Sequence, residues 1–191
     1  KLFNMSAELD AFIKHSLTEF DRAIDHLQKE LQKVRTGKAS TNIVDGILVN
    51  YYGSNVPINQ VANISLSDSR TIAIQPFEKK VIGDIEKAIF ESNLGITPQN
   101  DGEMIRITIP PLTEERRKEF VKHIKHYGEE GKVSVRSSRH KVLEFIKKEQ
   151  KNGLAEDIAK RRETEIQAKV TEYSSKIDKI VESKEKEIMT V

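Results

Sequence analysis

Cysteine is absent from this chain of 191 residues. Its absence excludes disulfides, thiol chemistry and zinc sites built on cysteine. Long hydrophobic runs are also missing: there is no stretch of 18 apolar residues and no charged-then-apolar leader, which predicts a soluble, cytoplasmic chain without a membrane partner. Aromatic residues make up only 6% of the chain, and few of them lie near its most basic segment. Stacking on the bases of a single strand is therefore not expected.

Charge, in contrast, is abundant: charged residues make up 32% of the chain, against 37% hydrophobic residues. This balance is typical of long amphipathic helices rather than of a compact enzyme. The net charge of +2 is unevenly distributed, because residues 113–148 carry eleven basic and six acidic groups. Segments 1–36, 37–112 and 149–191 each lie between −2 and 0. This asymmetry favours a polyanionic partner for residues 113–148.

Segment 6–35 has apolar residues at alternating steps of four and three, the spacing of a heptad seam. These residues are Ile13, Leu17, Phe20, Ile24, Leu27, Leu31 and Val34. The pattern predicts a long helix with one apolar stripe. Thr36-Gly37 supplies the signal for its end.

The pattern changes between residues 38 and 111. Short alternating runs rich in Val, Ile and Tyr predict strands, with turns at Gly53-Ser54 and at 67–69. Residues 78–95 have apolar side chains at helical spacing, and residues 104–109 alternate strictly, with the isoleucines on one side. The segment therefore predicts a small domain of strands with one helix, closed by a proline pair.

Heptads return from Thr113, a candidate N-cap followed by two glutamates in the first turn. The seam residues are Val121, Ile124, Gly128, Gly131, Val135, Ser138, Val142 and Phe145. Because Gly and Ser are poor helix formers, their place in the seam predicts a close contact with another helix.

Asn152-Gly153 breaks the second helix, and a third long helix is expected after it. The apolar stripe of this third helix consists of Ala159, Ile166, Val170, Tyr173, Ile177 and Ile180. Its spacing matches that of the two preceding helices, so the three stripes can form one shared core.

The predicted fold class is α+β: an elongated three-helix bundle with an inserted small β/α/β domain. The bundle consists of residues 1–36 and 113–191, and the inserted domain of residues 37–112. Hinges are expected near 36–38 and 110–112, with Gly37, Pro110 and Pro111 as the backbone elements.

No residue pattern indicates catalysis, a metal or a cofactor. The stretch TGKAST (36–41) imitates the end of a phosphate-binding loop, but the required first glycine is Gln32, inside a helix. His123 and His126 are three residues apart and have no obvious third ligand. The chain is therefore not expected to be an enzyme; an enzyme remains the alternative for which no residue can be named.

A row of cations is the candidate site. Its members are Lys118, Lys125, Lys132 and Arg139, seven residues apart, flanked by Lys122 and Arg136 and headed by Arg117. Glu129 and Glu130 interrupt it, as expected of an ordinary solvated helix face. Against that interpretation, no acidic residue occurs from 131 to 143, and arginine suits bidentate contacts with phosphates. Phosphate and shape recognition of double-helical RNA is the functional alternative.

Six motifs carry a resemblance to a known family. They are KVRTGKAS (33–40), DGILVNYYG (45–53), DSRTIAIQPFEK (68–79), EKAIFESNLGITP (86–98), PPLTEERRKEF (110–120) and VSVRSSRH (133–140). With these motifs in this order, the chain resembles the bacterial ribosome recycling factors, and the resemblance covers essentially its whole length. The resemblance implies an L-shaped molecule in which a three-helix bundle is joined by two strands to a β/α/β domain.

The resemblance also implies a function. Members of this family split post-termination ribosomes into subunits, together with elongation factor G and its GTP hydrolysis. The bundle is expected to bind the large subunit and its 23S-type ribosomal RNA. By motif, the important arginines are Arg35, Arg117, Arg136 and Arg139. Family members often have a second basic residue directly after the last of these arginines. This chain departs from that pattern, because His140 follows Arg139.

An adaptor protein is the competing class. Its heptad seams would join helices of another protein, and residues such as Ile24 and Val170 would then hold an oligomer together. The family resemblance implies a monomer instead. The state of association in solution distinguishes the two.

Overall fold

The computed structural model describes the backbone of residues 2–190 and the side chains of residues 7–190. The chain forms two compact units: one contains the residues up to Arg35 and those from Glu114 onward, the other Thr36–Thr113. The predicted outer bounds at 1 and 191 lie outside the described residues. The predicted α+β class is confirmed, since helices make up the first unit, and two antiparallel sheets with one α-helix make up the second.

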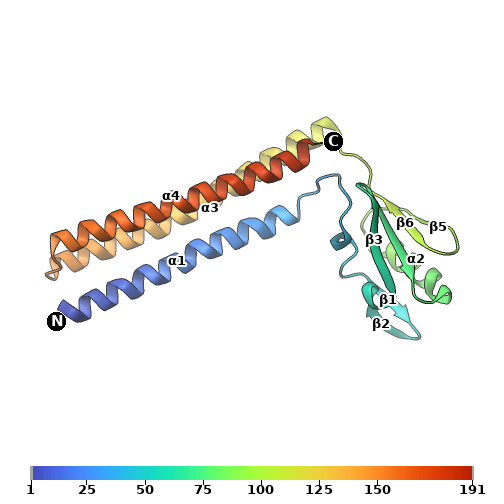
Figure 1. Cartoon of the computed structure of the whole chain (residues 1–191), viewed down its shortest axis with the longest axis horizontal. Helices are drawn as coiled ribbons and strands as arrows, with labels where there is room; N and C mark the ends of the chain where they lie inside the picture. The colour runs from blue at the N-terminus through green and yellow to red at the C-terminus, as the bar shows by residue number, and fades with distance from the viewer. Residues whose placement is uncertain (1, 191) are drawn as a thin grey trace. The chain divides into compact units, whose positions relative to one another are not determined.

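Three long helices lie side by side in the first unit (Figure 1): α1 (Leu2–Gln32), α3 (Glu114–Lys151) and α4 (Glu156–Met189). The chain reverses between α3 and α4 at Gly153, whose φ of +111° favours glycine. The backbone N–H of Leu154 donates to the carbonyl of Glu149 at 2.9 Å and closes the turn. The predicted break at Asn152-Gly153 is thus confirmed.

The seam of α1 differs from its prediction. Ser16 and Ala23, which the heptad pattern passed over, are 2% and 9% exposed, whereas Ile13 and Ile24 are only partly buried at the edges of the core. Because α1 packs against both α3 and α4, it buries a wider stripe, which includes the small residues Ser16 and Ala23. The helix also ends at Gln32, three residues earlier than predicted, because Lys33 and Val34 bond to carbonyls only three residues back.

The predicted close approach at the α3 glycines is confirmed. A Cβ added to Gly128 would lie 2.7 Å from Cγ2 of Val181, and one added to Gly131 would lie 3.4 Å from Cδ1 of Ile177. Both neighbours belong to α4. The two glycines therefore let the α3 and α4 backbones approach more closely than larger residues would allow.

The end of the α3 seam was predicted one residue too early. Ile146 is fully buried, and the predicted Phe145 is partly buried and stacks on Phe12 of α1, with ring centroids 4.5 Å apart. A step of four instead of three moves the buried stripe, because 3.6 residues make one helical turn.

The second unit contains two separate sheets. The strands are β1 (Leu48–Tyr51), β2 (Ser54–Pro57), β3 (Ala62–Asp68), β4 (Thr71–Pro76), β5 (Pro98–Asn100) and β6 (Ile105–Thr108). β1 and β2 form a hairpin, and the other four form an antiparallel sheet in the order β3-β4-β6-β5. Helix α2 (Ile82–Glu91) packs against β1 and β5. The alternation predicted for 104–109 is confirmed, because Ile105 and Ile107 are fully buried.

The hairpin turn lies one residue before its predicted place. Tyr52 and Gly53 form the two-residue loop, with φ values of 48° and 87°, and Ser54 already begins β2. Two positive φ values are the mark of the turn that matches the twist of paired strands. Tyr52 is one of two non-glycine residues with positive φ in the described part of the chain.

The two connections that lead to the second unit are held beside the turn between β3 and β4. Ala39 N–H donates to the carbonyl of Ser69 at 2.8 Å, and Ile109 N–H donates to the carbonyl of Arg70 at 2.7 Å. Gly37 has a φ of +77°, and a Cβ there would lie 3.2 Å from Cγ of Leu112. The chain thus enters and leaves this unit at neighbouring points.

Candidate nucleic-acid interface

The predicted cation row lies along the flank of α3 that faces α4. Lys125 and Lys132 follow the seam residues Ile124 and Gly131 by one position, which turns them to the side of the seam. Nζ of Lys132 lies 2.6 Å from Oδ1 of Asp178 on α4. Nζ of Lys125 lies 3.4 Å from a carboxylate on the same helix, Oε1 of Glu185.

Arg139 occupies a different environment from these two lysines. Since α3 and α4 run antiparallel, one heptad beyond Lys132 on α3 corresponds to one heptad before Asp178 on α4. That position is Thr171, which has no charge. Within the described residues Arg139 makes no ion pair, and its buried Nε has no hydrogen-bond partner. The guanidinium of Arg139 is therefore not neutralised by any of the described side chains.

Arg136 is held only loosely. Its Nη2 lies 3.7 Å from Oε2 of Glu129, and the two side chains are 59% and 62% exposed. An exposed ion pair of this kind contributes between about 0 and 1 kcal/mol, so the pair opens readily for a competing anion. Arg136 and Arg139 are three residues apart and share one side of α3, which suits a phosphate backbone.

Lys132 is only partly accessible. Its side chain is 20% exposed and also lies 3.6 Å from Glu129. The hydrogen bond from Lys132 to Asp178 raises the pKa of the lysine above its usual value, and both nearby carboxylates add to that effect. The ammonium is therefore fixed in its charged form and already paired.

The residues near the start of α3 have separate surroundings. Lys118 pairs with Glu114 at 3.1 Å, and both side chains are exposed. Nη1 of Arg117 donates to the carbonyl of Met189 at 3.3 Å, so this arginine caps the C-terminal end of α4. Arg35 is exposed just beyond the end of α1. The structure thus groups Lys125, Lys132, Arg136 and Arg139, and does not bring Arg35 into the row.

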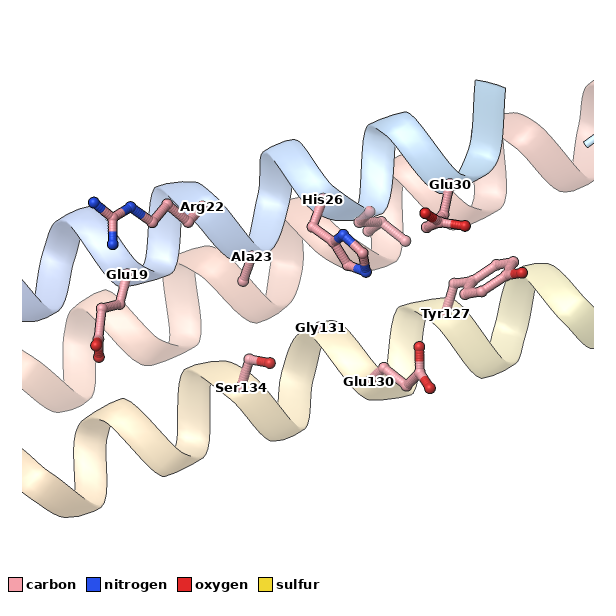
Figure 2. A pocket seen from close by; sticks show the side chains of 10 residues that line it. Glu19, Arg22, Ala23, His26, Glu30, Tyr127, Glu130, Gly131 and Ser134 are labelled. Atoms are coloured by element: carbon pink, nitrogen blue, oxygen red, sulfur yellow. The ribbon is translucent and has the colours of Figure 1, made fainter. Parts of the chain in front are cut away.

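The opposite flank of α3, facing α1, is hollow and rich in carboxylates (Figure 2). A groove of about 410 Å³ lies between the two helices. It is lined by Glu19, Arg22, Ala23, His26, Leu27, Glu30, Tyr127, Glu130, Gly131 and Ser134. Three carboxylates in this groove make it a poor surface for a polyanion.

These carboxylates are paired within the chain. Oγ of Ser138 on α3 donates to Glu19 of α1, and Lys141 lies 3.7 Å from the same carboxylate. The hydrogen bond from Ser138 lowers the pKa of Glu19, and Lys141 acts in the same direction. Glu30 pairs with Lys33 at 2.7 Å. This flank is therefore a polar contact between helices rather than a charged surface.

The described part of the chain contains neither a candidate metal centre nor a candidate membrane span. No group of three or more His, Cys, Asp or Glu side chains there could hold a metal ion. No helix there is both long and apolar enough to cross a membrane.

The sequence prediction missed the residues of α4 that face the row. Asp178 and Glu185 are seven residues apart, as are Lys132 and Lys125, and this matching interval was a usable signal. The missing information was which helix packs against this flank of α3 and in which register.

The fold defines an α+β protein in which a small sheet unit interrupts a unit of three long helices. The sequence profile of the ribosome recycling factor family matches residues 27–189. The ribosome-recycling factor of Cytophaga hutchinsonii is 46% identical over 184 residues, covering 96% of this chain and 99% of its own. That of Porphyromonas gingivalis is 48% identical over 185 residues, covering 96% and 100%. The chain belongs to the ribosome recycling factor family.

Solved structures agree with this assignment. A ribosome recycling factor in solution matches with a TM-score of 0.75 and 40% identity, covering 96% of this chain and 98% of its own. A second match has a TM-score of 0.60 and 38% identity, covering 95% and 98%. It comes from a structure of the T. thermophilus factor and E. coli elongation factor G bound to the E. coli post-termination complex.

Proposed function

We propose that this protein binds the 23S-type RNA of the large ribosomal subunit through the α4-facing flank of α3. Together with elongation factor G and its GTP hydrolysis, it then splits post-termination ribosomes into subunits in the cytoplasm. The observation that carries the binding role is the uncommitted guanidinium of Arg139, three residues from the loosely paired Arg136. The matched structure that contains elongation factor G and a post-termination complex supports the choice of partners.

Electrostatic anchoring requires a rod that presents its cations at fixed intervals. The 38 residues of α3 span about 57 Å at ~1.5 Å per residue. Phosphate contacts fix the position of a protein on RNA, and each contact releases counterions. Lys118 and Lys125 extend the proposed surface toward the start of α3, while Arg117 and Arg35 lie at that end of the three-helix unit.

The splitting step needs no covalent chemistry by this chain. In the proposal, the sheet unit pivots on the connections at 36–38 and 110–112 when elongation factor G displaces it. Gly37 permits the positive φ at the first connection, and Pro110-Pro111 fix their own φ at the second. The hydrogen bonds of Ala39 and Ile109 attach both connections to the same turn, the one between β3 and β4.

The binding role is tested by co-sedimentation with large ribosomal subunits across a salt series. The double variant Arg136→Ala/Arg139→Ala is expected to bind on the order of 100-fold more weakly at low salt. Its plot of log affinity against log salt should be flatter by about 1.4–1.8, because two phosphate contacts are lost. Unchanged affinity at moderate salt would rule out the anchoring role.

The pivot is tested separately by lengthening one connection with two glycines between Pro111 and Leu112. Subunit splitting is expected to fall while affinity for the large subunit stays unchanged, because force is transmitted only through a connection of the right length. An equal fall in affinity would show that the connections serve binding instead of movement.

The adaptor alternative loses its main support in the structure. The seams of the three helices pack against one another, and Val170 is buried in the shared core. We therefore propose a monomer, which sedimentation of the isolated protein tests directly.

A further inference from the structure

We infer that Asp178 and Glu185 of α4 limit the number of α3 cations that are available for RNA. They act as positioning residues: each holds one lysine of the row against the α3–α4 edge and lowers the affinity of the protein. This inference rests on the proposed function and identifies what sets the strength of that binding.

The geometry shows two different arrangements along one row. Lys132 and Lys125 are each paired with a carboxylate of α4, at 2.6 Å and 3.4 Å. Asp178 is itself 55% exposed, while Lys132 is only 20% exposed. The lysine stem thus lies along the protein surface with its ammonium at the carboxylate, where a phosphate would have to replace Asp178.

An ion pair within the protein reduces the gain from RNA binding. A lysine that meets a phosphate contributes through the release of counterions from the RNA. Lys132 must first leave Asp178, so part of that gain is cancelled. Arg139, opposite Thr171, has no such competitor on α4.

The heptad interval makes this an ordered pattern. At three successive positions along the row, α4 offers Glu185, Asp178 and Thr171 to Lys125, Lys132 and Arg139. The same stretch of α3 therefore has two cations paired with α4 carboxylates and one, Arg139, without an ion pair among the described residues. A factor that must leave the large subunit after each round gains from this restraint, because weaker binding is usually faster release.

Asp178→Asn tests the inference because the amide keeps the size of the side chain and loses its charge. At low salt the variant is expected to bind large subunits roughly three- to tenfold more tightly. The plot of log affinity against log salt should be steeper by about 0.7–0.9, the effect of one added phosphate contact. Asp178→Glu should restore wild-type affinity, because the carboxylate returns.

Glu187→Gln is the matched control. It removes the same charge from α4, nine residues away and on the opposite side of the helix, where Glu187 pairs with Lys184 at 3.1 Å. Its affinity and salt dependence should match those of the wild type. If both variants bind more tightly to the same extent, net charge alone is responsible and the inference is wrong.

Glu185→Gln is a second variant, for use if Asp178→Asn does not fold. It should also raise the affinity for large subunits, because it removes the carboxylate that pairs with Lys125. Arg139→Ala measured in parallel separates the two possible failures. If Arg139→Ala weakens binding but neither carboxylate variant strengthens it, Asp178 and Glu185 do not limit the affinity, and the proposed binding surface stands. If Arg139→Ala also has no effect, the proposed binding surface itself is wrong.

Discussion

The two flanks of α3 differ in packing and in charge. Facing α4, the glycines bring the two backbones together, and cations line the edge. Facing α1, small and polar residues border a groove of about 410 Å³ whose carboxylates are paired with side chains of this chain. A tightly packed edge holds its charged side chains at fixed intervals, and this is the property that contact with a phosphate backbone requires.

The largest expected difference between the flanks concerns packing. Gly128→Leu should lower the free energy of unfolding by about 3 kcal/mol, because even a Cβ would lie 2.7 Å from Cγ2 of Val181. Ser134→Leu enlarges an exposed residue of α3 on the groove side and should change the free energy by less than about 0.5 kcal/mol. Denaturation in urea measures both. Equal losses would show that the two flanks are packed alike.

A smaller effect is expected from the polar contact on the α1 side. Ser138→Ala removes the hydrogen bond that lowers the pKa of Glu19. The free energy of unfolding at pH 7 should fall by about 2 kcal/mol, as expected for a hydrogen bond to a charged group. The neighbouring exposed Ser137→Ala is the control and should have little effect.

The pH dependence of Ser138→Ala follows from the direction in which the pKa of Glu19 is shifted. Because the pKa of Glu19 is lowered in the folded protein, its stabilisation is present above the ordinary value of 4.5 and is lost as the pH falls through the lowered value. The difference in the free energy of unfolding between wild type and Ser138→Ala should therefore shrink in acid. A difference that stays constant down to pH 2 would exclude the charged form of Glu19 as its cause.

The smallest effect should come from removing a carboxylate on the groove side. Glu130 pairs with His126 at 3.2 Å and lies away from the cation row. Glu130→Gln should therefore leave the affinity for large subunits within about twofold of wild type, with an unchanged salt dependence. A gain equal to that of Asp178→Asn would remove the distinction between the flanks.

Much of the fold could be predicted from periodicity. The helices, the break at Gly153 and the buried isoleucines of β6 follow from local spacing, because a helix or strand that buries one side must repeat its apolar residues. The glycines of α3 also indicated a close helix contact. Ser16 and Ala23 of α1 were missed because small residues are selected by the distance between helices, which is a tertiary property.

The candidate site was predicted only in part. The seven-residue interval predicted that Lys125, Lys132 and Arg139 share one side of α3, and the two lysines both pair with carboxylates of α4. Their different availability depends on the residues of α4 opposite them, and hence on the register between two helices. The structural contact of Arg117 with the end of α4 was invisible for the same reason.

The most direct test of the account compares two arginines on opposite flanks by their effect on the salt dependence of large-subunit binding. Arg22 lines the groove and makes no ion pair among the described residues, so Arg22→Ala and Arg139→Ala remove the same charge. Arg139→Ala is expected to flatten the plot of log affinity against log salt by about 0.7–0.9, while Arg22→Ala should leave it unchanged. Equal flattening by both, or by neither, would contradict the claim that RNA is bound along the α4-facing flank of α3.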